Sequence, residues 1–146
     1  MKFEKFLKGC GTHGQIYKRE NGDRWLICGG VGMKIPVGVD NLLGSGEVSD
    51  KIKTLVEGLI KADTGDAVSL IKARVPADGK ASDIVRIFGD SFDLEIGIKN
   101  ADFGLLEKAD FNLAEVEVEG DDFFEDKYLL ILDNLGEDVI GFIKGE

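Results

Sequence analysis

Histidine and cysteine are scarce in this chain, with one histidine and two cysteines among 146 residues. Cys10 and Cys28 form no CxxC motif and no second pair follows them, so we expect two free thiols in a reducing compartment and no bound metal. His13, the single histidine, lies in a glycine-rich stretch without an evident orienting partner, which argues against a catalytic triad built around it. We therefore expect a non-enzymatic protein with no catalytic residues, no metal and no cofactor.

The chain also lacks a long apolar run. No stretch approaches the roughly 18 to 20 apolar residues that span a bilayer, and charged residues interrupt the first eight positions where a signal peptide would need an apolar core. We therefore expect a protein that stays inside the cell and has no membrane partner. There are only two prolines, no low-complexity tract and no linker, and the length fits one domain of ordinary size. The prediction is a single domain over residues 1–146.

Acidic residues, in contrast, are abundant and unevenly distributed. Residues 1–62 contain ten Lys or Arg against seven Asp or Glu, a net charge of +3, whereas residues 63–146 contain eight against twenty-one, a net charge of −13. A strongly anionic surface repels nucleic acid and attracts cationic surfaces, so we expect a protein partner and no direct nucleic-acid binding. A basic corner together with an acidic half also suits head-to-tail or ring assembly, which makes a homo-oligomer our expectation.

Two helices are predicted in the first half of the chain. Phe3 and Phe6 share one face of a short N-terminal helix that the following glycines end, and residues 1–8 could serve as an arm that docks on a partner. Ser49 is a good N-cap for the one clear long helix, over residues 49–62, where apolar residues recur with a period of about 3.6 residues.

Strand signals dominate the rest of the sequence. Asn21-Gly22 between strand-like residues 15–19 and 24–28 predicts a β-hairpin. The second half consists of strand-like runs separated by turn residues, which predicts a β-meander. Its strands are expected at residues 68–75, 84–88, 92–98, 113–118, 128–132 and 139–143. Together these signals predict an α+β fold, mostly an antiparallel sheet, with a C-terminal meander and the two helices.

The pattern within the later strands predicts where each lies in the sheet. Residues 113–118 alternate apolar and acidic side chains, as a half-buried antiparallel strand does, so Glu115 and Glu117 should face water. Residues 128–132 and 139–143 are apolar on both faces, so we expect these two strands at the centre of the sheet or under the helix.

One sequence motif resembles a nucleotide site. Residues 9–14 match the letters GxGxxG, but a helical pattern precedes them and a strand follows, the reverse of a dinucleotide-binding loop. We interpret this segment as a flexible bend. A less favoured alternative is a small-molecule or nucleotide sponge, or an enzyme, that uses the glycine-rich loops with Cys10, His13 or Cys28.

An acidic run is the best candidate for a functional surface. It lacks the regular D-x-D-x-D-G loop of a calcium site, so the alternatives are a solvated face that discourages edge pairing and a surface that binds another protein. Two adjacent phenylalanines within the run would be natural anchors if they are exposed. The predicted partner-binding residues are Glu115, Glu117, Glu119, Asp121, Asp122, Phe123, Phe124, Glu125 and Asp126, together with Phe3 and Phe6 of the N-terminal helix.

Four stretches of the chain, Met1–Leu7, Asn21–Leu26, Gly32–Pro36 and Asn100–Leu106, resemble small proteins carried by phages and prophages of Gram-positive bacteria. The similarity spans most of the chain and includes no catalytic motif. The resemblance implies a viral setting, either the cytoplasm of a bacterial host or the virion. In that setting, small acidic non-enzymatic proteins act as capsid-associated components or as inhibitors of host defence.

The leading hypothesis is therefore a phage structural or capsid-associated protein that acts by assembly, binding itself or another virion or host protein. The alternative is an anti-defence inhibitor whose carboxylate-rich sheet imitates the phosphates of a nucleic acid and binds a basic host protein.

Overall fold

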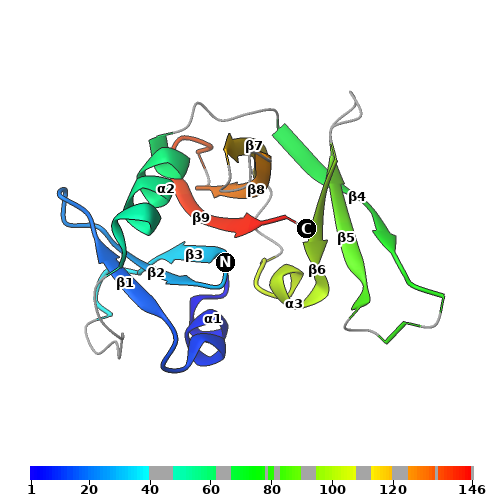
Figure 1. Cartoon of the computed structure of the whole chain (residues 1–146), viewed down its shortest axis with the longest axis horizontal. Coiled ribbons are helices and arrows are strands. Elements are labelled where there is room, and N and C mark those ends of the chain that lie inside the picture. The colour runs from blue at the N-terminus through cyan, green and yellow to red at the C-terminus, as the bar shows by residue number, and fades with distance from the viewer. Residues whose placement is uncertain are drawn as a thin grey trace.

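The computed structural model describes residues 1–39, 48–61, 67–77, 79–80, 83–89, 95–107, 113–119, 125–133 and 135–145. Its elements alternate short helices with groups of strands (Figure 1). In chain order they are α1 (Phe3–Cys10), β1 (Gln15–Lys18), β2 (Arg24–Cys28), β3 (Val31–Lys34), α2 (Asp50–Lys61), β4 (Ala67–Arg74), β5 (Val85–Gly89), β6 (Glu95–Lys99), α3 (Asn100–Phe103), β7 (Leu113–Glu119), β8 (Glu125–Leu132) and β9 (Val139–Lys144).

The nine strands form one antiparallel sheet in the order β1-β2-β3-β9-β8-β7-β4-β5-β6. Each run of three consecutive strands is a small meander, and β7-β8-β9 lies between the other two. The predicted α+β class with a mostly antiparallel sheet is confirmed. The two strands with apolar residues on both faces, β8 and β9, are central, as their sequences indicate.

The C-terminal meander is interrupted at one place. β7 pairs with β4, through Ala67 opposite Ala114 and Val68 opposite Leu113, and not with β6, the strand that precedes it in sequence. β6 instead lies over β8, where the Lys127 ammonium donates a hydrogen bond to the Glu95 carbonyl oxygen at 3.2 Å. The sheet therefore folds back so that β4-β5-β6 covers part of its own central strands.

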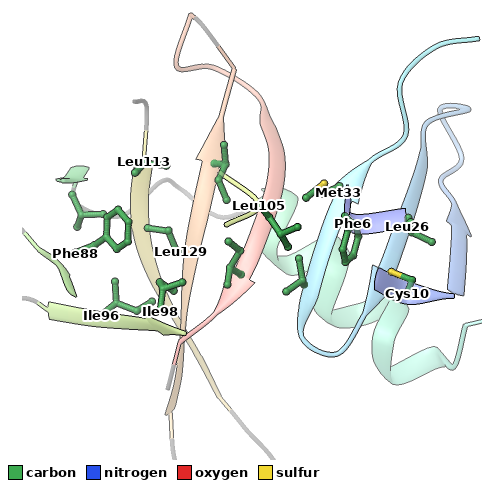
Figure 2. Packing of buried hydrophobic residues seen from close by; sticks show 14 of the residues in the cluster. Phe6, Cys10, Leu26, Met33, Phe88, Ile96, Ile98, Leu105, Leu113 and Leu129 are labelled. Atoms are coloured by element: carbon green, nitrogen blue, oxygen red, sulfur yellow. The ribbon is translucent and has the colours of Figure 1, made fainter. Parts of the chain in front are cut away.

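Two hydrophobic clusters lie on opposite faces of the central strands. The first joins β4-β5-β6 and α1 to the sheet; Figure 2 shows Ile96 and Ile98 near Leu129. The second lies under α2, where Val56 and Leu59 are fully buried. Neighbouring residues of β8 enter different clusters, which explains why that strand is apolar on both faces.

The local elements follow their sequence signals closely. The Ser49 hydroxyl accepts a hydrogen bond from the Ile52 amide at 3.3 Å and caps α2, which falls within the predicted range. The hairpin of β1 and β2 turns through Gly22, whose φ of +93° favours glycine. α1 runs through Gly9 to Cys10, so only residues 11–14 of the segment predicted to be a bend, residues 9–14, lie between α1 and β1.

Candidate interaction surfaces

The acidic strand β7 has only part of the water-exposed face that its alternation predicts. Glu115 is only 5% exposed, because its side chain lies on the same face of β7 as Leu113, a member of the first cluster. The expectation that Glu115 faces water was wrong; alternation identifies residues that share a face but does not say whether a second layer covers it. Glu117, two residues further along, is exposed.

Lys127 on β8 compensates the charge of this buried carboxylate. Its ammonium nitrogen lies 3.4 Å from Glu115 Oε1 and 3.7 Å from Glu117 Oε1, and it also bonds to the backbone of Glu95. Glu115 Oε2 accepts no hydrogen bond within the described part of the chain. Lys127 therefore links three strands, and part of the acidic charge is neutralised inside the protein.

The structure describes only some of the remaining predicted residues of the acidic run. Asp126 is half-buried and its carboxylate lies 3.6 Å from the Lys144 ammonium nitrogen. Glu119 and Glu125 belong to paired ends of β7 and β8, where they lie opposite one another. Asp121, Asp122, Phe123 and Phe124 lie outside the described residues.

The two aromatic residues predicted for a docking arm belong to the protein's own interior. Phe6 is 5% exposed within the first cluster, and Phe3 is half-buried against it. The Lys2 amide donates to the Leu105 carbonyl at 2.8 Å, and the Lys5 ammonium donates to the Gly104 carbonyl at 3.2 Å, so α1 is held to the segment that follows α3. An amphipathic pattern marks an apolar helix face without identifying the surface that it covers.

An ion-pair cluster joins the hairpin to α2, and the sequence analysis did not find it. Glu57 accepts hydrogen bonds from Arg19 Nε at 2.9 Å and from the Tyr17 hydroxyl at 2.8 Å. The Arg19 bonds lower the pKa of Glu57 to about 2, against the opposing effect of burial, and Tyr17 and Lys61 add to the lowering. These side chains line a cavity of about 350 Å³. Because Glu57 lies 40 residues from Tyr17 and 38 residues from Arg19 in sequence, no local motif marks the cluster.

The most exposed strand is β4. Every residue of β4 except Val68 is exposed, although the strand is paired with β5. Leu70, Ile71 and Val75 are 48%, 50% and 62% exposed. A strand was predicted here, but its exposure was not. The only sequence signal for the exposure is that the adjacent aliphatic residues Leu70 and Ile71 are followed by Lys-Ala-Arg, so the strand has no single apolar face.

The two cysteines and the histidine differ in how far they are exposed. Cys10 is buried and Cys28 is half-buried, and both are free thiols. Burial, together with a hydrogen bond to Cys28, raises the pKa of the Cys10 thiol to about 12. His13 is exposed, and its backbone amide bonds to the Cys10 carbonyl at 2.9 Å.

Comparison with protein-family models, curated proteins and solved structures finds no match. Across the described ranges, no three His, Cys, Asp or Glu side chains gather into a group that could hold a metal ion. None of the helices within those ranges is long and apolar enough to cross a bilayer.

Proposed function

We propose that the protein acts by assembly, as a phage structural or capsid-associated protein, and that β4 is its contact strand. The observation that carries the proposal is the exposure of this strand. Five large hydrophobic side chains are exposed among the described residues, and three of them, Leu70, Ile71 and Val75, lie on β4 or directly after it. Burying such a group of aliphatic side chains against another subunit releases water and stabilises the complex.

The backbone of β4 supports the same proposal. β7 pairs only with Ala67 and Val68, so the edge that residues 69–73 of β4 present away from β5 has no strand partner in the described part of the chain. β4 lies on the outside of the β4-β5-β6 group (Figure 1). An unpaired edge carries free backbone donors and acceptors, which a strand or segment of a second molecule can satisfy.

The charge of β4 indicates which surface it would contact. Lys72 and Arg74 are both exposed, and two identical β4 strands placed side by side would bring these cations together. An acidic surface would instead attract them, and a second copy of this chain, with its net charge of −10, supplies one. We therefore propose a head-to-tail arrangement in which β4 of one copy contacts the acidic surface of the next.

Light scattering on a sizing column tests this proposal. Leu70→Ser combined with Ile71→Ser should give a monomer, whereas the wild type should form an oligomer that is smaller at about 500 mM salt than at about 50 mM, because salt screens the charge attraction. Val37→Ser combined with Leu135→Ser is the matched control, since these exposed residues lie away from β4; it should assemble like the wild type. A monomeric wild type under all conditions, or a β4 variant that still assembles, would refute the proposal.

The inhibitor alternative draws less support from the same strands. A nucleic-acid mimic needs carboxylates presented to the partner, but Glu115 is buried and Lys127 lies close to Glu117. The phage setting itself rests on the sequence resemblance.

A further inference from the structure

The two cysteines are far apart in sequence, but the hairpin and α1 bring them together. In the register of β1 and β2, Gln15 pairs with Ile27, so the next position away from the turn places Gly14 opposite Cys28. Cys28 packs against the first hydrophobic cluster, and Cys10, the last residue of α1, is a buried member of the same cluster. Both thiols therefore lie on the inner side of the hairpin.

The Cys10 side chain fills the space that Gly14 leaves open. A Cβ at Gly14 would lie 3.1 Å from the Cβ and 3.7 Å from the Sγ of Cys10, and 2.9 Å from Leu26 Cδ1. Leu26 and Cys28 share one face of β2, since they are two residues apart, and Figure 2 shows the Cys10 sulfur beside Leu26.

The Cys10 thiol thus occupies the position of a side chain opposite Cys28. Opposed residues of an antiparallel pair have Cβ atoms about 4.5–5.5 Å apart, a separation at which two thiols can reach each other. The two thiols are also joined by a hydrogen bond.

The two thiols differ in how easily a reagent can reach them. Cys10 is 3% exposed, whereas Cys28 is half-buried. Burial and the bond to Cys28 raise the pKa of the Cys10 thiol to about 12, so a reagent in solution meets a reactive thiolate first at Cys28. An accessible cysteine with a second cysteine beside it, able to resolve the first adduct, is typical of redox-active pairs.

We propose that Cys10 and Cys28 are a redox-active pair that forms a reversible disulfide, with a low-molecular-weight disulfide as the oxidant. Cys28 first loses its proton to solvent and attacks one sulfur of the small disulfide, whose S–S bond breaks and releases one small thiolate. Cys10 then loses its proton and attacks Cys28 Sγ, which releases the second small thiolate. The two thiolates take up the two protons, so the protein is oxidised by two electrons and the small disulfide is reduced to two thiols.

The new bond would fix the C-terminal end of α1 to β2. The other end of α1 is already held where the Lys2 amide donates to the Leu105 carbonyl at 2.8 Å. Reducing surroundings keep both thiols free, and oxidising surroundings close the bond and fasten the helix at both ends. The pair does not depend on assembly through β4, because neither thiol lies on that strand.

Mass spectrometry of the intact, folded protein tests this pair. The protein is incubated with mixtures of reduced and oxidised glutathione, quenched with acid and weighed. A glutathione adduct on Cys28 should form first and then give way to a species two hydrogens lighter than the starting protein. The equilibrium constant for closure should be at least about tenfold larger in the folded protein than in urea, because the fold already holds the ends of the loop together.

Two variants separate the roles of the thiols. Cys10→Ser should keep the glutathione adduct on Cys28, since no second thiol can release it. Cys28→Ser should stay unmodified while it is folded, because the remaining thiol is buried. Circular dichroism confirms that each variant is folded. Both variants should assemble like the wild type, so light scattering distinguishes a failure of this inference from a failure of assembly.

Three results would overturn the inference. The first is a wild-type protein that forms no adduct and no disulfide, or that keeps the adduct on Cys28 without closing the bond. The second is a disulfide between two copies, seen as a doubled mass that reduction removes. The third is an equal equilibrium constant for closure in the folded and the unfolded chain, because it would show that the fold does not bring the thiols together.

Discussion

The bonds between Glu57 and the hairpin should make stability depend on pH in a specific way. Arg19 holds the carboxylate through two hydrogen bonds, at 2.9 and 3.2 Å, and lowers the pKa of Glu57 from 4.5 to about 2. A group whose pKa is lower in the folded state stabilises the protein above its unfolded pKa, and that stabilisation is lost as the pH falls from 4.5 towards 2. The size of the shift sets an upper limit of about 3 kcal/mol.

The replacement Glu57→Gln removes the charge and keeps the shape of the side chain. Since about a quarter of the Glu57 side chain is exposed and solvent screens the pair, we expect a loss of about 2 kcal/mol in the free energy of unfolding at neutral pH. The difference between wild type and variant should fall below about 1 kcal/mol near pH 3, because Glu57 then gains a proton on unfolding.

Urea denaturation at pH 7, 5, 4 and 3 measures this difference, with unfolding followed by circular dichroism. Glu137→Gln is the control, since Glu137 is an exposed carboxylate; its difference from the wild type should stay small at every pH. A Glu57→Gln difference that is constant across the pH range would refute the reasoning, since it would reflect packing and not charge.

Further predictions concern glycines and thiols. A Cβ at Gly32 would lie 2.3 Å from Phe142 Cζ, so Gly32→Ala should destabilise the protein by about 1–3 kcal/mol. Gly58 lies in open space on α2, so Gly58→Ala should stabilise the protein by up to about 1 kcal/mol. Urea midpoints that move in the same direction for both variants would contradict this pair of predictions. At about pH 8, iodoacetamide should label Cys28 and spare Cys10 in the folded protein, because burial keeps the Cys10 thiol protonated; equal labelling rates by mass spectrometry would contradict that burial.

Local signals allowed the helix and the hairpin to be predicted from the sequence. Ser49 supplies its own cap hydroxyl, and the apolar period of α2 places Val56 and Leu59 on one face. Asn21-Gly22 sets a turn that needs only neighbouring residues, and the Asn21 side chain accepts a hydrogen bond from the Asp23 amide at 3.0 Å. Such features depend on residues that are close together in the chain, so the local sequence is enough to predict them.

Other features depend on contacts between distant segments. Nothing near Leu113 indicates that β7 pairs with β4, because the partner strand lies more than 40 residues away in sequence, at Ala67 and Val68. The burial of Glu115 follows from the second layer that β6 forms over β8, whereas Phe6 is buried where α1 is held to the segment after α3. Periodicity identifies faces, and the tertiary arrangement decides which of those faces water reaches.

Hydrogen–deuterium exchange of the β4 backbone at two protein concentrations tests the central claim most directly. If β4 is the contact strand between copies, the amides of residues 69–75 should exchange more slowly at high concentration than at low, and exchange in β1 should not change. The Leu70→Ser and Ile71→Ser variant should lose this concentration dependence. Rapid exchange of residues 69–75 at both concentrations, with an oligomer present, would show that the copies meet elsewhere and would contradict the account.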